Sequence, residues 1–268
     1  MKKKVSKLPG KRIIATAVFV TFLISSVVSA QTLDDIKWFT EEYPPYNYSE
    51  NGTPKGLCVE ILLELWKRAG LNKTARDILV VSWPRGVEKI KSIQGTCLFT
   101  TTLTAERSDV FGWKYVYPVP YINKASNFHL IAKKNMKIKF DSLDEIKKYK
   151  RNFGVVRDDI GELLLLNAGV SDDRLNKTPT PEFLANTIYK GRHDVIAYDF
   201  SAIAIKMKAL GIDPKLYEIV YTFPDMPLGY AFHHNTSQQI IGKLQKILDE
   251  LYLDGTIETI LKRYTQKQ

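Results

Sequence analysis

The chain has 268 residues, long enough for one large domain or two smaller ones, and its formal net charge is +10. Six basic residues and no acidic residue fall within positions 1–30, so residues 31–268 carry a formal charge of only +4. The other lysines and arginines are scattered among acids, which argues against nucleic-acid binding. The cysteines lack histidines at ligand spacing and there is no Gly-rich phosphate loop, so we expect no metal and no cofactor.

Residues 1–30 have the pattern of a secretory signal peptide. Lysines and an arginine precede an apolar stretch at 13–28, which ends in the small-residue sequence Val28-Ser29-Ala30. The strongly apolar part is shorter than the ~20 residues that a membrane-spanning helix needs. We therefore predict cleavage after Ala30 and export to the periplasm. In that oxidising compartment Cys58 and Cys97 either form one disulfide or remain buried free thiols.

The first half of the exported chain alternates strands with helices. Its apolar patterns predict strands at 36–40, 78–81 and 97–99, and helices at 57–70 and 87–93. Such alternation predicts a parallel sheet, and parallel sheets bind ligands at the carboxyl ends of their strands. Tyr43, Trp83 and residues 100–107 follow those ends, so we expect them to lie together.

The stretch from Thr100 to Arg107 reads Thr-Thr-Thr-Leu-Thr-Ala-Glu-Arg. Hydroxyls follow an apolar strand, Thr104 is a candidate helix N-cap, and Arg107 falls in the first helical turn. A guanidinium presents a planar fork of donors that matches two carboxylate oxygens, and neighbouring hydroxyls add donors. We interpret the stretch as a carboxylate-binding site; the alternative is a surface arginine on a helix.

A strand at 127–133 leads away from the first unit, and a second α/β unit begins near residue 141. Its predicted elements are a helix at 143–150, a strand at 152–156, helices at 161–167 and 181–190, a strand at 195–198 and a helix at 200–210. Strands at 219–223 and 228–232 are predicted to return to the first unit, before two final helices. We therefore predict a discontinuous first lobe (31–122 and 223–268), a second lobe (123–222) and two crossings that form a hinge.

Aromatic residues gather just before the first crossing. Trp113 and Tyr117 are the ones that could reach a ligand cleft. Large aromatic side chains are usually buried, so we expect both to pack in the core, with contact to the cleft as the alternative.

Several segments together resemble bacterial family 3 extracellular solute-binding proteins. They are Tyr43-Pro44-Pro45-Tyr46, the helix opened by Gly56 with Glu60 inside it, Thr104 to Arg107, Gly191 to Asp199, and Leu253-Asp254-Gly255-Thr256 between two C-terminal helices. Their order and spacing cover nearly the whole exported chain.

This resemblance implies an α/β protein with the two-lobed type II periplasmic-binding-protein-like fold and two hinge crossovers. Such a protein closes on a small polar solute, usually an amino acid, and delivers it as a monomer to an inner-membrane ABC transporter permease. The resemblance also assigns a ligand site: Arg107 binds a carboxylate, Thr102 and the backbone near Thr100 assist it, Tyr43 and Trp83 enclose the solute, and Asp199 takes an ammonium.

The sequence departs from the family at the start of the second lobe's helix. Family members for amino acids usually have a Gly-Thr or Gly-Ser pair there, whereas this chain has Asp159-Ile160. An acid repels a carboxylate placed beside it, so the departure favours a more cationic solute. The preceding Arg157 and Asp158 are candidates for ligand contacts, for a salt bridge that closes the lobes, or for a solvated charged turn.

Two alternatives to transport remain open. A few proteins of this fold, such as cyclohexadienyl dehydratases, are lyases that use a carboxylate for proton transfer, and Glu162 lies where such an acid would be. A glutamate in a helix first turn is also favoured by the helix dipole alone. The other alternative is a ligand sensor that acts through a separate membrane partner.

Overall fold

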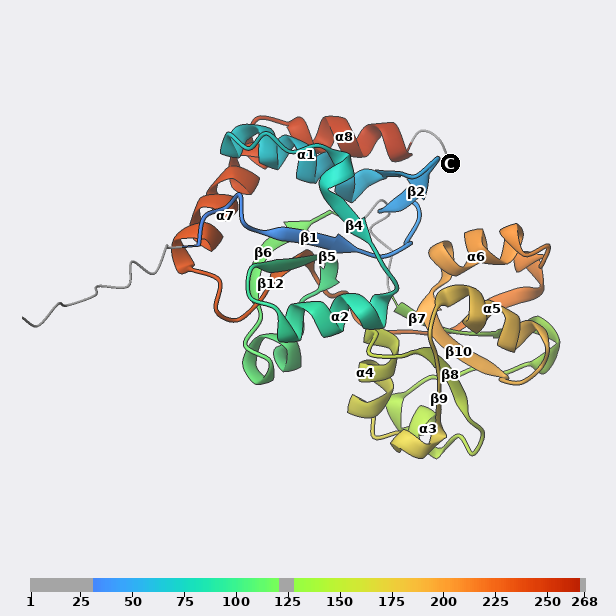
Figure 1. The fold of residues 1–268 in the computed structure, drawn as a ribbon. Coiled ribbons are helices and arrows are strands. Elements are labelled where there is room, and N and C mark those ends of the chain that lie inside the picture. Colours follow the sequence, from blue (N-terminus) through green and yellow to red (C-terminus); the bar gives the residue numbers. More distant parts are fainter. Residues whose placement is uncertain (1–30, 121–127, 266–268) are drawn as a thin grey trace, which may run out of the picture. The chain divides into compact units, whose positions relative to one another are not determined.

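The computed structural model describes residues 31–120 and 128–265 (Figure 1). The predicted signal peptide and the predicted lobe boundary at 122/123 lie outside these residues. Within the described ranges, no helix combines the length and the apolar character that crossing a membrane requires.

The first sheet, in the part of the chain that the structure describes, has the strand order β4-β1-β5-β12-β6. These strands are β4 (Ile78–Val80), β1 (Lys37–Thr40), β5 (Thr96–Thr102), β12 (Leu228–Phe232) and β6 (Lys114–Val119). The β1 strand is parallel to β4 and β5, as the alternation predicts, whereas β12 is antiparallel to β5 and β6. Pro118 is tolerated in β6 because this strand lies at the sheet edge.

Helices cover both faces of this sheet, with α2 on one side and α1 and α8 on the other (Figure 1). The helices are α1 (Leu57–Ala69), α2 (Trp83–Ser92), α7 (Gln238–Leu253) and α8 (Thr256–Thr265). A small hairpin of β2 (Tyr48–Glu50) and β3 (Thr53–Lys55) precedes α1. Turns η1 (Ala75–Asp77) and η2 (Glu106–Val110) connect the remaining elements.

The second sheet has the order β11-β7-β10-β8-β9 among the described residues. Its strands are β11 (Tyr217–Thr222), β7 (Phe128–Lys133), β10 (Val195–Asp199), β8 (Phe153–Val156) and β9 (Leu175–Thr178). The helices around it are α3 (Leu143–Lys148), α4 (Ile160–Asn167), α5 (Pro181–Tyr189) and α6 (Phe200–Ala209), with short turns η3 (Lys134–Met136), η4 (Asp172–Arg174) and η5 (Pro214–Leu216).

One predicted strand lies in the other sheet. The strand predicted at 219–223 is β11, which pairs antiparallel with β7 in the second sheet instead of returning to the first. Its buried residue Val220 packs with Phe153 and other residues of the second sheet. The chain crosses back to the first sheet only after β11. Of the two strands that we predicted there, at 219–223 and 228–232, only the second, β12, belongs to the first sheet.

The two cysteines do not form a disulfide. Both are buried free thiols, which was the second of the two alternatives that the sequence left open. Cys58 lies on α1 and Cys97 on β5, and both are enclosed by the core of the first sheet. Burial raises the pKa of Cys58 to about 12, which leaves its thiol protonated and unreactive at neutral pH.

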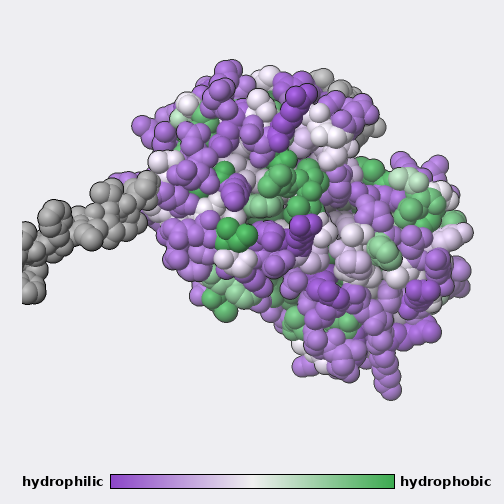
Figure 2. Space-filling model, viewed as in Figure 1, coloured by the Kyte–Doolittle hydropathy of each residue, from purple (hydrophilic) through white to green (hydrophobic). Residues whose placement is uncertain are grey.

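Hydrophilic residues cover most of the face seen in Figure 2, with separated apolar patches. On the α5–α6 side the exposed apolar residues include Phe183, Tyr189 and Ile205. Tyr117 is 43% exposed, so our expectation that it packs in the core is wrong, whereas Trp113 is buried.

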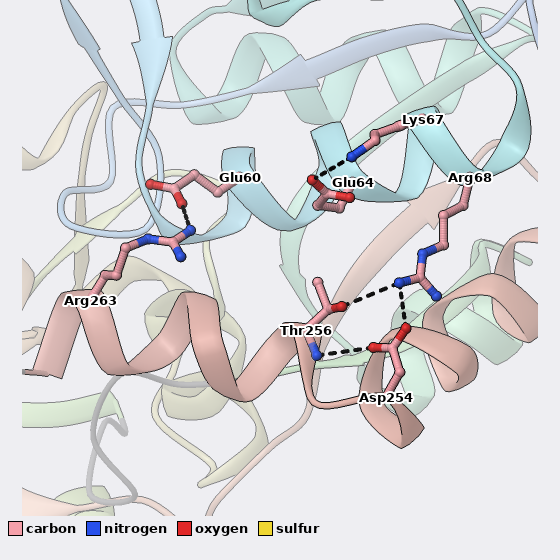
Figure 3. A network of polar contacts seen from close by, with 7 residues as sticks. All are labelled: Glu60, Glu64, Lys67, Arg68, Asp254, Thr256 and Arg263. Carbon is pink, nitrogen blue, oxygen red and sulfur yellow. Dashed lines mark hydrogen bonds and ion pairs between the residues drawn. The ribbon is translucent and has the colours of Figure 1, made fainter.

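A polar network fastens α8 to α1 (Figure 3). We call it the α1–α8 clamp and define it as Glu60, Arg68, Asp254, Thr256 and Arg263. Ion pairs join Arg68 to Asp254 and Arg263 to Glu60, and the Thr256 backbone N–H donates to Asp254 Oδ1 at 3.0 Å. The Asp-Gly-Thr segment that suggested the family therefore has a structural role here, because Asp254 caps α8 and binds α1.

Candidate functional site

The loop after β1 carries the first predicted site residue, Tyr43. The Asn47 side chain donates to the Glu41 carbonyl at 2.6 Å, and the Tyr43 N–H donates to the Asn47 carbonyl at 2.7 Å. Tyr43 is buried and stacks on Tyr46, with ring centroids 5.0 Å apart. Its hydroxyl donates to Asp199 Oδ2 at 2.8 Å, which joins this loop to the second sheet.

The carboxyl end of β5 contains a β-bulge at Thr100. Phe99 pairs with Tyr230 and Thr101 with Gly229, which leaves Thr100 without a partner in the β12 register. Its φ of 61° is in the left-handed region, which is strained for a β-branched residue. The Thr100 hydroxyl is buried beside the Cys58 thiol and makes no hydrogen bond to an oxygen or nitrogen of the described residues. Bulges and strain of this kind concentrate at binding sites.

Arg107 is 3% exposed, so it is not a surface arginine. The turn that holds it begins as predicted, because its N–H donates to Thr104 Oγ1 at 3.2 Å. Its guanidinium lies over the rings of Trp83 and Trp113, 5.1 and 5.8 Å from their centroids. It donates to the Thr102 carbonyl at 3.0 Å. A further guanidinium bond reaches the Asp158 carbonyl of the second lobe at 3.4 Å.

Asp199 ends β10 and caps α6, and it is 1% exposed. Its Oδ1 accepts from the Ser201 N–H at 2.7 Å and from the Ser201 hydroxyl at 2.6 Å, while Oδ2 accepts from Tyr43. Both oxygens therefore already have donors, whereas the resemblance assigned them to a ligand ammonium.

The structure does not bring Arg157 into this group. The residue is exposed, and its backbone N–H donates to the Thr178 carbonyl at 2.9 Å. It does not line the cavity described below. A solvated charged turn, one of our three interpretations, describes it best.

A small cavity lies where the two lobes meet, and six of the seven predicted site residues line it or contact its lining. The lining residues are Glu41, Tyr43, Trp83, Thr100, Thr102, Arg107, Phe128, Asp159, Ile160, Tyr198 and Leu228. Its volume is about 10 Å³, close to that of one water-sized sphere, so the cleft is closed. A second space of about 80 Å³ shares Arg107 and Asp159 with this cavity and is also lined by Trp113 and Glu162 among others.

Hydrogen bonds between the lobes hold the cleft closed. Trp83 Nε1 donates to the Asp158 carbonyl at 2.7 Å, in addition to the bonds of Arg107 to Asp158 and of Tyr43 to Asp199. The carbonyl of Asp158 is presented inward although the residue is exposed, because its φ of 60° turns the backbone just before α4.

Two acids share the cavity with Arg107. Asp159 caps α4 and is buried, and its enclosure raises its pKa to about 6 despite the nearby guanidinium. Glu41 retains some exposure as a residue, but its carboxyl is enclosed in the cleft. Burial, followed by the charge of Asp159, raises the pKa of Glu41 well above its usual value. Acids with such shifts are common at functional sites.

Sequence reasoning missed Glu41 and Tyr198 as lining residues. Glu41 directly follows the last residue of β1, so the rule that ligands meet the carboxyl ends of parallel strands could have found it. Tyr198 is a buried strand residue whose pattern is that of any core tyrosine. Among the described residues, no group of His, Cys, Asp and Glu is arranged to hold a metal ion.

The two sheets and the enclosed interlobe site define a two-lobed type II periplasmic-binding-protein fold. Residues 36–267 match the sequence profile of the bacterial extracellular solute-binding proteins, family 3. The chain belongs to this family.

Solved structures of this fold are similar to the chain at low identity. A histidine kinase sensor domain that resembles periplasmic binding proteins has a TM-score of 0.70 at 17% identity, covering 85% of this chain and 95% of that one. The arginine-, lysine-, histidine-binding protein ArtJ of Geobacillus stearothermophilus has a TM-score of 0.69 at 17% identity, with 87% and 96% covered.

A reconstructed ancestral amino-acid-binding protein, AncCDT-1, described as a precursor of cyclohexadienyl dehydratase, has a TM-score of 0.66 at 17% identity, with 88% of this chain and 100% of that chain covered. Curated proteins give no significant match. At these identities the structures establish the fold, and the function has to be argued from the site.

Proposed function

We propose that this protein binds a small cationic solute, such as a basic amino acid or a related amine, in the interlobe cleft. The observation that carries the proposal is the charge of the cavity lining. Among its described residues the charged ones are Glu41, Asp159 and Arg107, so acids outnumber the single cation. An enclosed site with more acidic groups than cations favours a positively charged ligand, because such a ligand can balance the acid that has no cation.

In this proposal the residues of the cavity have different roles. Tyr43 and Trp83 enclose the solute, and Glu41 and Asp159 face its cationic group. Arg107 has donors beyond those it gives to two backbone carbonyls, so it can also hold a solute carboxylate together with Thr100 and Thr102. Asp199 acts mainly through Tyr43, whose hydroxyl it orients.

We further propose that the protein works as an exported monomer in the periplasm, after removal of residues 1–30. The first lobe (31–122 and 223–268) and the second (123–222) close around the solute by motion at the two crossings. The closed form then delivers the solute to an ABC transporter permease. The likeness to a histidine kinase sensor domain makes a signalling partner the other candidate recipient of the closed form.

Binding, and not lyase chemistry, is the activity we propose. The candidate proton-transfer acid of the lyase alternative, Glu162, has both oxygens engaged. Lys177 lies 2.7 Å from Oε1, and the Asp158 N–H donates to Oε2 at 2.7 Å. Turnover of prephenate or arogenate by the purified protein, lost in Glu162→Gln, would contradict this proposal.

A melting-temperature screen tests the ligand class, because binding to the folded form alone raises the melting temperature. We expect L-arginine, L-lysine and putrescine to raise it, and L-glutamate and succinate to leave it unchanged. Calorimetry then confirms direct binding of each positive compound. A shift with the anions and none with the cations would sink the proposal.

A further inference from the structure

We propose that Glu41 holds a proton in the closed cleft and that an incoming cationic solute displaces it, so that binding and proton release are coupled. The inference rests on the proposed function, since it concerns the same site. It explains how two acids from opposite lobes can line one small cavity with a single arginine.

The geometry forces the two acids together. Glu41 comes from the loop after β1 in the first lobe, and Asp159 comes from the start of α4 in the second. Both line the same cavity of about 10 Å³, which has room for about one water molecule between them. Two enclosed carboxylates that lack a full complement of cations resist ionising together, so one of them keeps a proton.

The groups around Glu41 do not supply the missing positive charge. It is faced by Asp159, by Tyr198 of β10, by Glu182 and Lys206 of α5 and α6, and by Arg107. Lys206 lies 2.6 Å from Glu182 and is engaged by that carboxylate. Arg107 faces both acids at once, and its charge can balance only one of them.

Asp159 is the better stabilised of the two acids. The backbone N–H of Ile160 donates to its Oδ1 at 2.7 Å, and Arg107 favours its ionised form. Glu162, which opposes ionisation of Asp159, is itself paired with Lys177. We therefore assign the negative charge at neutral pH to Asp159 and the proton to Glu41.

The direction of the coupling follows from competition for one carboxylate. A solute cation stabilises ionised Glu41, so its binding releases a proton and becomes tighter as the pH rises. While Glu41 is protonated in the empty protein, exchange of one proton for one cation changes the affinity by up to about tenfold per pH unit.

Two measurements on the mature protein test the proposal. The first is a 13C NMR titration of the side-chain carboxyls without ligand, in which Glu41→Gln identifies the Glu41 signal. The second is calorimetry with L-arginine and with putrescine at pH 5.5, 6.5 and 7.5, at each pH in two buffers whose own pKa values lie close to that pH. These buffers differ in their heat of ionisation, so the difference between them counts the protons released.

We expect Glu41 to titrate well above the range of an exposed glutamate, up to one proton to be released per solute bound, and the Kd to fall by up to about tenfold per pH unit while Glu41 is protonated. In Glu41→Gln the proton release and the pH dependence should both disappear. The control Glu258→Gln, which removes an exposed acid paired with Lys262 on α8, should behave as the unaltered protein.

The outcomes separate the two proposals. If a cation binds with no proton release and with a pH-independent Kd, or if Glu41 titrates as an exposed glutamate does, the coupling is wrong and the proposed function stands. If Glu41 titrates high and neither cation binds at any pH, the proposed function is wrong, and the exchange with it.

Discussion

The cleft and the α1–α8 clamp both contain acids and arginines, but only in the clamp does each acid have its own cation. In the clamp each drawn carboxylate has a cation beside it, and the network lies at the surface (Figure 3). In the cleft, two enclosed acids share one arginine. Charges that are balanced within the protein stabilise a fold, whereas charges left unbalanced in an enclosed site are available to a ligand.

The pKa values follow this difference. Hydrogen bonds from Thr256, together with Arg68, lower the pKa of Asp254 to about 2. Burial raises the pKa of Asp159 to about 6. At neutral pH an ionised aspartate therefore stabilises the folded state in the clamp and destabilises it in the cleft. A cationic ligand offsets the destabilisation in the cleft.

The largest effect is expected from removing the cation of the cleft. Arg107→Met removes the group that we propose holds the solute carboxylate, and a buried charge pair that loses one partner costs ~3 kcal/mol or more. We expect the affinity for L-arginine, measured by calorimetry, to fall about 100-fold or more. Arg157→Met is the matched control, because that arginine is exposed and outside the cavity, and its affinity should stay within twofold. Equal affinities in the two variants would contradict the site.

A neutral isostere at Asp159 should stabilise the empty protein. Because the pKa of Asp159 rises from 3.8 unfolded to about 6 folded, the folded state binds more protons between these values, and its stability falls as the pH rises from about 4 to 6. Asp159→Asn keeps a helix cap and removes this fall, so the unfolding free energy at pH 7 should increase by roughly 2–3 kcal/mol.

Urea unfolding at pH 4.5 and pH 7 measures this change. The gain of Asp159→Asn over the unaltered protein should be large at pH 7 and small at pH 4.5. A variant that is less stable than the unaltered protein at pH 7 would show that Asp159 belongs to a balanced network like that of the clamp.

The smallest effect is expected in the clamp, where removing the acid should decrease stability at neutral pH instead of increasing it. The lowered pKa of Asp254 contributes stability above its unfolded value of 3.8, and that contribution is lost as the pH falls towards 2. Asp254→Asn keeps the cap on Thr256 and loses the ion pair with Arg68. We expect a small decrease in melting temperature at pH 7 that vanishes near pH 2, with solute affinity unchanged.

The sequence by itself determined the local framework of the protein. Apolar periodicity predicted the strands β1, β4, β5 and β12 of the first sheet and its helices α1 and α2, but not the edge strand β6. The position of Tyr43, Trp83 and Arg107 after strand ends predicted that they meet. These features depend on residues close together in the chain, so their pattern is visible without a structure.

Only the tertiary structure decided which sheet β11 joins, which acids enter the cavity and which arginine is buried. Arg107 and Arg157 both follow strands closely, yet one lies between two indole rings and the other in solvent. Glu41 and Asp159 are 118 positions apart in the sequence. They line one cavity with a single arginine only because the two lobes meet there. Burial and pKa shifts arise from contacts between distant segments, and no local pattern encodes them.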